Sequence, residues 1–368
     1  MNNTILKNNI IQHFECYPKA KIQDYLKFIY QEEFGCGHLL ADVGASFERL
    51  KEEAMVANMS QPTVEILGEN FARLHLSALK ELSMETFHRL FVLSARQLTG
   101  SEQGFYAKAE LLKEVCLSEN LPFTVEEIEL ELAELKKKTL KPFSHSLSFH
   151  QEYQPAYRVI EQKYVQFLPL IAKIDEMLTQ NPQTVLSIDG DCGSGKTTLA
   201  ELLREIYDCN LISMDDFFLQ KEQRTPERLA EIGGNIDYER FCDEVLIPLK
   251  AGVSFSYQPF NCQTFAFDDP VHLQTKNLTI IEGSYSQHPI FAKNYDWKVF
   301  LSVPENIQST RILKRNGAFL HEKFQNIWIP MEKKFFSTYQ IKENSDMQFE
   351  ILTSSEQNNH VKTEQFTS

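Results

Sequence analysis

The hydrophobic pattern changes in character about halfway along the chain. In the first half, apolar side chains recur three and four positions apart, as over residues 22–30 and 87–98, which is the spacing of one helix face. Thr124 and Glu127 form a capping box and predict the start of a further helix. Strand-like alternation is almost missing there. We therefore expect residues 1–152 to form an all-α domain.

The pattern after this domain predicts a connector and then an α/β domain. Residues 153–180 keep helical spacing and are interpreted as a connector helix, kinked or broken at Pro169. From 181 to 353, short β-branched runs alternate with helical segments, which predicts a parallel sheet with right-handed crossovers. Residues 354–368 are polar and predict a disordered tail. The expected strands are 184–188, 210–214, 278–281, 299–303 and 348–352.

Composition describes an ordinary soluble globular protein, with 42% hydrophobic and 24% charged residues over 368 positions. The net charge of −14 argues against a nucleic-acid or membrane-surface binder, because no basic excess is present to neutralise phosphates. Seven dispersed cysteines favour reduced thiols over a disulfide framework. No apolar run reaches membrane-spanning length, and the start lacks the apolar core of a signal peptide. We expect a cytoplasmic protein with no nucleic-acid or membrane partner.

One glycine-rich stretch has the spacing of a phosphate-binding loop. It matches G-x-x-x-x-G-K-[ST] between a predicted strand and a predicted helix, which is the context that such a loop requires. Its glycines let backbone N–H groups and the positive helix end surround an anion. Lys196 would then reach the β and γ phosphates, and the Thr197 hydroxyl would hold Mg²⁺. The candidate nucleotide-binding residues are Gly190, Asp191, Cys192, Gly193, Ser194, Gly195, Lys196, Thr197 and Thr198.

Acidic and basic residues follow this loop in the order that phosphoryl transfer needs. Asp215 and Asp216 follow one predicted strand and Glu282 ends another, so their carboxylates should meet at the carboxyl edge of the sheet. Arg311 and Arg315 are four residues apart and share a helix face. Alone, the paired acids fit a turn or an N-cap, Glu282 fits a solvated strand end, and the arginines fit a wet helix face. Their order after the loop favours a site for phosphoryl transfer.

The stretch 31–38 is the part of the first domain that suggests more than packing. Cys36 and His38 are flanked by glycines, but two ligands without a second pair nearby are a weak zinc signal. We favour a turn that ends the helix, with Gly35 as its cap. The other histidines of this domain are interpreted as ordinary surface or hydrogen-bonded residues: His75, His88, His145 and His150.

The ordered set resembles the uridine kinase and phosphoribulokinase family of P-loop kinases over about residues 184–352. The resemblance implies a P-loop NTPase fold, in which helices flank a parallel sheet. The leading helical domain resembles the extension of some bacterial proteins labelled uridine kinase. The motifs that carry the resemblance are G-x-x-G-S-G-K-T-T, then Met214-Asp215-Asp216-Phe217-Phe218, Asn235-Ile236-Asp237, Glu282-Gly283 after a strand, and Thr310-Arg311 with Arg315 on a helix.

The resemblance also implies roles for individual residues. Asp215 is similar to the family's general base, which accepts the proton of the substrate hydroxyl and contacts Mg²⁺ together with Glu282 and Thr197. Arg311 and Arg315 resemble the start of the arginine lid that closes over the phosphates. The catalytic set so implied is Asp215, Lys196, Arg315 and Arg311.

The substrate side matches the family less well. Asp237 stands where the family's aspartate holds ribose hydroxyls, but residues 238–241 replace the usual His-Pro-Asp-Ala-Phe. Phe260 keeps the aromatic ring of a Val-Tyr-Asp-Phe segment, whereas residues 259–262 lack its acid. Gly317 is expected to end the lid helix early. Phosphate chemistry is therefore better supported than nucleobase recognition.

We predict ATP- and Mg²⁺-dependent phosphoryl transfer to a hydroxyl of a small molecule, either a nucleoside of the uridine or cytidine type or another sugar-like alcohol. The alternative is an ATP-binding regulatory switch that signals through the first domain and hydrolyses ATP slowly, whatever alcohol is added. A GTPase is disfavoured because no Asn-Lys-x-Asp motif follows the loop. A protein-binding role of the first half and a homo-oligomer are left open.

Overall fold

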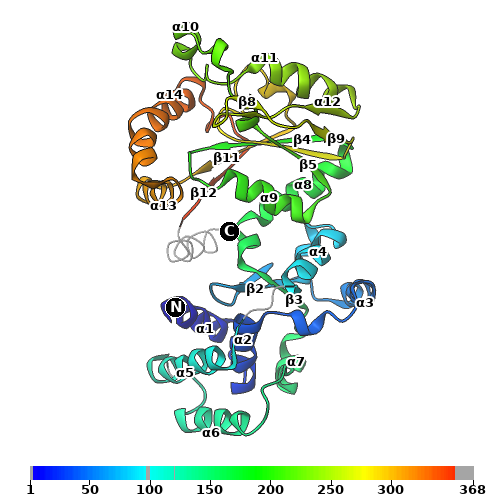
Figure 1. Cartoon of the computed structure of the whole chain (residues 1–368). Coiled ribbons are helices and arrows are strands. Elements are labelled where there is room, and N and C mark those ends of the chain that lie inside the picture. The colour runs from blue at the N-terminus through cyan, green and yellow to red at the C-terminus, as the bar shows by residue number, and fades with distance from the viewer. Residues whose placement is uncertain (1–2, 97–99, 120, 353–368) are drawn as a thin grey trace. The chain divides into compact units, whose positions relative to one another are not determined.

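The computed structural model of the chain describes residues 3–96, 100–119 and 121–352 (Figure 1). It forms two compact units, the first ending at Asp175 and the second beginning at Glu176. This division falls inside helix α8 (Leu168–Gln180), and hence inside the segment predicted as a connector. The predicted tail, 354–368, lies outside the described residues.

The first unit is mostly helical, as its pattern predicts. Gly35 ends α2 with a φ of 63°, and its N–H group donates to the Gln31 carbonyl, so the predicted glycine cap is present. The Thr124–Glu127 capping box opens α6. The helices are α1 (Asn3–Cys16), α2 (Ile22–Phe34), η1 (Gly37–Leu39), α3 (Val43–Val56), η2 (Leu76–Lys80), α4 (Met84–Ala95), α5 (Glu102–Glu119), α6 (Val125–Lys136) and α7 (Leu147–Tyr153).

The first unit also contains a three-stranded antiparallel sheet, which the all-α prediction missed. Its order is β1 (Val64–Ile66), β2 (Phe71–His75) and β3 (Tyr157–Glu161). The central strand β2 is buried along its whole length. Strands β1 and β2 form a short hairpin, and β3 reaches β2 only after a long helical stretch, so the three short strands leave little periodic signal.

The predicted connector helix 153–180 is wrong over its first half. Helix α7 ends at Tyr153, β3 follows, and a 3₁₀ segment, η3 (Gln162–Phe167), leads into α8. Val159 and Ile160 pair with β2, and their β-branched side chains favour the extended backbone of a strand. Pro169 lies in the first turn of α8, where a missing N–H group has no cost, and it does not break a longer helix.

The second unit is built on a five-stranded parallel sheet in the order β12-β11-β4-β10-β5. All five predicted strands are present within two residues of their predicted ends. Glu282 at the end of β10 pairs with Ile188 on one side and Ser213 on the other. This register brings the carboxyl ends of three strands together. The strands are β4 (Thr184–Gly190), β5 (Cys209–Ser213), β10 (Leu278–Glu282), β11 (Trp297–Ser302) and β12 (Met347–Glu350).

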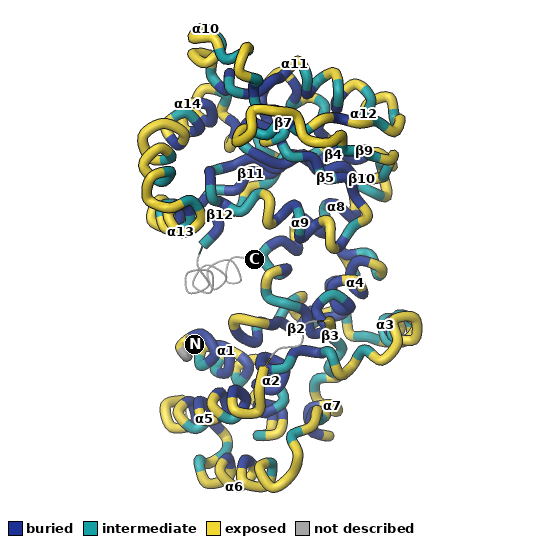
Figure 2. The backbone as a smooth tube through the Cα atoms, in the orientation of Figure 1, coloured by how far each residue is buried: buried dark blue, intermediate teal, exposed yellow. Residues whose placement is uncertain are grey.

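Helices cover both faces of this sheet, with α9 on one side and α11 and α12 on the other (Figure 1). The strands β4 and β10 are buried throughout (Figure 2). The helices are η4 (Met214–Phe217), η5 (Lys221–Gln223), α9 (Lys196–Ile206), α10 (Pro226–Ala230), α11 (Tyr238–Phe241), η6 (Cys242–Leu246), α12 (Ile247–Ala251), η7 (Ala292–Asn294), α13 (Glu305–Lys323), η8 (Phe324–Trp328) and α14 (Ile329–Tyr339).

Four short strands complete the second unit: β6 (Phe255–Tyr257) pairs with β9 (Val271–Leu273), and β7 (Phe260–Asn261) with β8 (Ala266–Phe267). The connection from β4 through the glycine-rich loop to α9, set in a parallel sheet flanked by helices, is the P-loop NTPase fold. The predicted α/β class is therefore confirmed. Among the described residues, none of the helices combines the length and the apolar character needed to span a bilayer.

Candidate active site

The glycine-rich loop is shaped by its glycines and by a neighbouring strand. Gly190 has a φ of 142°, and a Cβ atom there would lie 2.0 Å from the Leu301 carbonyl oxygen. The Asp191 N–H group donates to the same oxygen at 2.9 Å. Gly193 and Gly195 also have positive φ values, 75° and 98°. Only glycine fits this close approach and these turns.

Lys196 and Thr197 lie at the start of α9, where backbone N–H groups have no partner within the helix. The Lys196 ammonium group donates to the carbonyls of Gly190 and Asp191 at 2.7 and 3.1 Å, so its side chain folds back over the loop. The Thr197 hydroxyl donates to Glu282 Oε2 at 3.1 Å. The loop thus presents N–H groups, a cation and a hydroxyl to one place, which is the chemistry that a nucleotide phosphate requires.

Two carboxylates meet beside this hydroxyl. Glu282 pairs across the sheet with Ser213, two residues before Asp215, so the two carboxylates lie at the same edge. Burial raises the pKa of Glu282, and the charge of Asp215 raises it further. Hydrogen bonds from Ser213 and Thr197 act in the opposite direction. Two close carboxylates and a hydroxyl fit Mg²⁺, a hard cation that takes oxygen ligands and keeps waters or phosphate oxygens in its other positions. Among the described residues, no cluster of three or more acidic, histidine or cysteine side chains could hold a metal by itself.

Asp215 is exposed, in the 3₁₀ turn η4 that follows β5. Partial removal of its carboxylate from water raises the pKa of Asp215, and the charges of Lys196 and Arg315 act against that rise. Both cations therefore lie close to this carboxylate. The predicted residues Lys196, Thr197, Asp215, Glu282 and Arg315 thus come together at one edge of the sheet.

Helix α13 packs against the phosphate-binding loop. Arg311 Nη1 donates to the Gly193 carbonyl at 3.1 Å, and the Gln308 side-chain amide donates to the Cys192 carbonyl at 2.9 Å. The predicted helix end at Gly317 is confirmed, because the helical backbone is interrupted there and a second helical segment follows within the span of α13 (Glu305–Lys323). Gly317 takes a φ of 76° and a ψ of 170°, so the two helical segments of α13 meet at a kink.

Two buried carboxylates beside the loop were missed by the sequence reasoning. Glu332 on α14 accepts the Cys192 N–H group at 3.0 Å and the Ser284 hydroxyl at 2.6 Å. Burial raises the pKa of Asp189 to about 7, although Lys196 and two backbone N–H groups act to lower it. No motif marks Glu332, because it lies 140 positions from the loop residue that it contacts. Asp189, directly before the motif, could have been noticed as an acid inside an apolar strand.

The two predicted substrate residues are buried. Asp237 is only 2% exposed. Its carboxylate accepts the Gln223 side-chain amide at 2.8 Å and the Arg240 N–H group at 3.1 Å, which caps α11. Phe260 packs against Phe267, with 5.5 Å between ring centroids. In this structure Asp237 has a capping role, and its contact with a substrate stays a prediction.

Cys262, whose thiol feels the charge of the predicted base, contacts Arg224, and neither residue was assigned to the site from the sequence. Arg224 Nη2 is 3.7 Å from Cys262 Sγ, and its guanidinium lies over the Phe265 ring at 5.1 Å. Burial raises the pKa of the Cys262 thiol, Arg224 opposes this, and the charge of Asp215 adds to the rise. The Cys262 thiol therefore lies within reach of the charge of Asp215 and in contact with Arg224.

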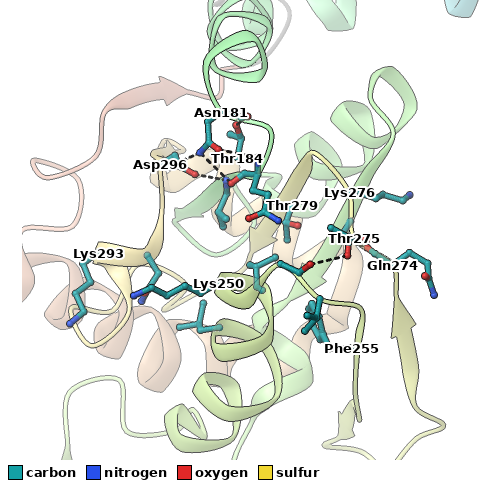
Figure 3. Close-up of a pocket in the computed structure, with 18 residues that line it drawn as sticks. Asn181, Thr184, Lys250, Phe255, Gln274, Thr275, Lys276, Thr279, Lys293 and Asp296 are labelled. Carbon is teal, nitrogen blue, oxygen red and sulfur yellow. Dashed lines mark hydrogen bonds between the residues drawn. The ribbon is translucent and has the colours of Figure 1, made fainter.

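A separate cavity of about 320 Å³ lies at the opposite edge of the sheet (Figure 3). Thr184, Asn210 and Thr279, at or next to the first residues of β4, β5 and β10, line it. Lys250 and Lys293 lie on one side of it and Phe255 on another. The phosphate loop follows the other end of β4, so this cavity is not part of the phosphate site.

Comparison with known proteins yields distant structural similarity. No protein-family model and no curated protein matches the chain. A possible uridine kinase from Bacillus stearothermophilus is similar over 49% of this chain and 99% of its own, with 22% identity and a TM-score of 0.37. A putative fructose transport system kinase from a Silicibacter species is similar over 45% and 89%, with 19% identity and a TM-score of 0.38. A shikimate kinase from Bacteroides thetaiotaomicron shows 12% identity over 46% and 86%, with a TM-score of 0.23. These values are too low to assign an activity, which has to come from the site itself.

Proposed function

We propose that the second unit is an ATP- and Mg²⁺-dependent kinase that transfers the γ-phosphoryl group to a hydroxyl of a small molecule. The observation that carries this proposal is the convergence of Lys196, Thr197, Asp215, Glu282 and Arg315 at the carboxyl edge of one parallel sheet. Phosphoryl transfer depends on positioning and on charge stabilisation, and this set supplies the groups for both.

The loop and α9 would hold the triphosphate. Backbone N–H groups of the loop would surround the phosphate oxygens. Lys196 would leave the carbonyls of Gly190 and Asp191, to which it donates here, and donate to the phosphate oxygens instead. Arg315, which lies near both Asp215 and Cys192, is placed to offset the charge on the transferred group. Thr197, Asp215 and Glu282 would hold Mg²⁺, which when bound neutralises phosphate oxygens.

Asp215 would act as the general base. Its side chain is exposed in the turn that follows β5, so a bound hydroxyl can reach the carboxylate and give up its proton there. The acceptor oxygen forms a bond to the γ phosphorus while the bond to the leaving ADP oxygen breaks. The hydroxyl proton passes to the Asp215 carboxylate.

The acceptor is proposed to be a nucleoside of the uridine or cytidine type or another sugar-like alcohol. Support comes from the position of Asp237 and Phe260 in a segment that resembles the family's sugar-binding part. Because the carboxylate of Asp237 is held by Gln223 and by the α11 cap, binding ribose through it would require Gln223 to move away. Cys262, which feels the charge of Asp215, and its neighbour Arg224 would offer further contacts.

Asp215→Asn tests the proposal. An amide cannot accept the proton, so we expect transfer to fall by about 10²- to 10⁴-fold while ATP binding is largely kept. An ATP-consumption screen over nucleosides, sugars and small alcohols would identify the acceptor, with this variant as the blank. Calorimetric titration with a non-hydrolysable ATP analogue would measure binding.

Asp216→Asn is the matched control. Asp216 is adjacent in sequence, but its carboxylate accepts the Tyr257 hydroxyl at 3.0 Å, so its loss should leave transfer within a few fold. Equal losses in the two variants would contradict the assignment of the base. ATP hydrolysis at one slow rate, unaffected by every acceptor, would instead support the regulatory switch.

A further inference from the structure

The interior of the first unit contains a chain of hydrogen-bonded polar side chains. Arg73 on β2 is 1% exposed and among the largest fully buried side chains. Its Nη1 atom donates to Glu65 Oε2 at 2.9 Å, and its Nε atom donates to Gln31 Oε1 at 2.8 Å. The other Glu65 oxygen lies 2.5 Å from His13 Nδ1. These groups come from the β1–β2 hairpin and from two helices, α1 and α2, that precede it in the chain.

The chain continues from Gln31 toward α7. The Gln31 amide donates to the Tyr157 hydroxyl at 3.2 Å, which lies 2.7 Å from His145 Nε2. His145 Nδ1 lies 2.9 Å from Asp24 Oδ1. Burial lowers the pKa of His145 to about 3, so the ring is neutral. Its Nδ1–H group then donates to Asp24 and its Nε2 accepts from Tyr157.

The same reasoning settles the two imidazoles at the other end. Burial lowers the pKa of His13, and it lowers that of His75 to about 4. His13 Nδ1–H donates to Glu65, and His75 Nδ1–H donates to Gln61 Oε1 at 2.8 Å. Each ring therefore keeps an Nε2 lone pair that can accept a hydrogen bond. Although burial opposes it, the charge of Arg73 holds the pKa of Glu65 below its ordinary range.

Three buried atoms of this cluster have no hydrogen-bond partner among the described residues: Arg73 Nη2, His13 Nε2 and His75 Nε2. All three belong to side chains grouped around Glu65, and His75 Nε2 lies 3.9 Å from Glu65 Oε2. A structural network normally satisfies its own members, because buried polar groups without partners are costly. Here one donor and two acceptors remain open beside one carboxylate.

The open atoms define the chemistry that would complete them. The charge of Arg73 is already neutralised by Glu65. Because the Nδ1–H groups of both imidazoles are used, their free Nε2 atoms can only accept a hydrogen bond. An ionised phosphate or carboxylate would meet these lone pairs without a proton to donate. A hydroxyl group both accepts and donates, so it matches Arg73 Nη2 and an imidazole Nε2 together.

Aromatic rings adjoin the same cluster. Arg73 lies over the Tyr157 ring at 4.7 Å, and the His13 ring centroid is 4.7 Å from that of Tyr17 and 4.9 Å from that of Phe28. These rings pack against Arg73 and His13 and hold both side chains in place. Glu65 keeps 14% of its side chain exposed on β1, the edge strand of the sheet, so the cluster reaches solvent there.

We propose that the first unit binds a small hydroxyl-bearing molecule of the sugar or polyol class at the cluster of Glu65, Arg73, His13 and His75. A ligand hydroxyl accepts from Arg73 Nη2 and donates to the Nε2 atom of one of the two histidines. This site lies wholly within the first unit and is separate from the phosphate site of the second.

The test is side-chain NMR of the full chain labelled with ¹⁵N-histidine, titrated without nucleotide with D-ribose, glycerol and myo-inositol. We expect the His75 and His13 Nε2 resonances to start as free acceptors and to shift saturably with at least one probe, as a new hydrogen bond forms. His75→Phe removes one acceptor and keeps a ring of similar shape. With the His13 Nε2 resonance as the readout, this variant should bind the probe at least about tenfold more weakly.

His88→Phe is the matched control, because His88 Nε2 is also buried without a partner but its ring adjoins Phe47 and Phe91. It should leave binding unchanged. The proposal is overturned if no probe shifts either resonance saturably, as expected when buried water completes the network. It is equally overturned if His75→Phe and His88→Phe bind alike. Should His75→Phe fail to fold, the wild-type titration still decides.

Discussion

At the scale of single residues, the phosphate loop is surrounded by carboxylates that do not face solvent. Asp189 is fully buried before the loop and accepts the N–H groups of Gly190 and Gln287 at 2.7 and 3.0 Å. Glu332 accepts from the loop itself. Such groups hold the loop in place, and their protonation links its stability to pH.

Asp189 should give the protein a measurable pH dependence. Its pKa is about 7 in the folded protein against an ordinary 3.8, so folding takes up a proton between these values. The stabilisation is present below pH 4 and is lost as the pH rises through 7. In Asp189→Asn this contribution is missing. The wild-type free energy of unfolding, minus that of the variant, should therefore fall by about 1.4 kcal/mol per pH unit between pH 5 and 6.5.

Urea unfolding at several pH values measures this difference, and the comparison with the variant cancels the titration of the other acids. The constant offset between the two proteins is not informative, because an asparagine amide cannot accept both N–H groups. Parallel curves would mean that Asp189 stays ionised in the folded protein.

The residues of the phosphate site could be predicted from the sequence because their spacing is short and specific. Lys196 and Thr197 belong to one nine-residue motif, and Asp215 and Glu282 each follow an apolar strand. Asp237 shows the limit of that reasoning, because its motif did not reveal that the carboxylate is used to cap α11. The histidines of the first unit show it again. Their interpretation as surface or hydrogen-bonded residues is confirmed for the hydrogen bonds of His75 and His145, but the sequence did not show that both rings are buried.

At the scale of elements, the strand–loop–helix unit depends on a close approach between β11 and the loop. The Leu301 carbonyl contacts Gly190 within the sheet, where neither backbone can move without breaking the pairing of β4 with β11. The kink at Gly317 is different, because a Cβ atom there would have no atom within 4 Å.

Gly190→Ala should therefore be far more damaging than Gly317→Ala. We expect the first change to lower the free energy of unfolding by more than about 3 kcal/mol and to abolish nucleotide binding, because it forces the loop off the sheet. The second should cost about 1–3 kcal/mol for its strained backbone or relax into a straighter helix. Chemical unfolding and titration with a nucleotide analogue measure both, and equal losses would contradict this account of the loop.

Elements were predictable where their signals are local. The capping box at Thr124, the glycine after α2 and the five apolar strands of the second unit depend on neighbouring residues. Strand β3 was missed because Val159 and Ile160 become strand residues only by pairing with β2, about 87 positions earlier. Helical periodicity around them hid that pairing.

At the scale of the whole molecule, each unit has its own apolar core. One core gathers residues between Leu6 and Val159, and another gathers residues between Val185 and Ile341. A core that is complete within one unit allows that unit to unfold cooperatively on its own. The nucleotide residues all belong to the second unit.

Calorimetry of the full chain should accordingly show two unfolding transitions. A non-hydrolysable ATP analogue with Mg²⁺, at about 100 times its Kd, should stabilise one of them by about 2.7 kcal/mol and leave the other in place. Lys196→Ala should remove the shift. One transition that moves as a whole would show that the two units unfold together.

The sequence by itself determined the α/β class of the second unit, its five strands and the donor end of its site, because these depend on short periodicities and on a compact motif. Tertiary structure decided which distant groups complete each site. Glu332 is brought to the phosphate loop by the return of α14, and Glu65, Arg73, His13 and His75 are brought together by helix and sheet packing. The physical reason is that burial and partnership arise from contacts between segments far apart in the chain, which no local pattern records.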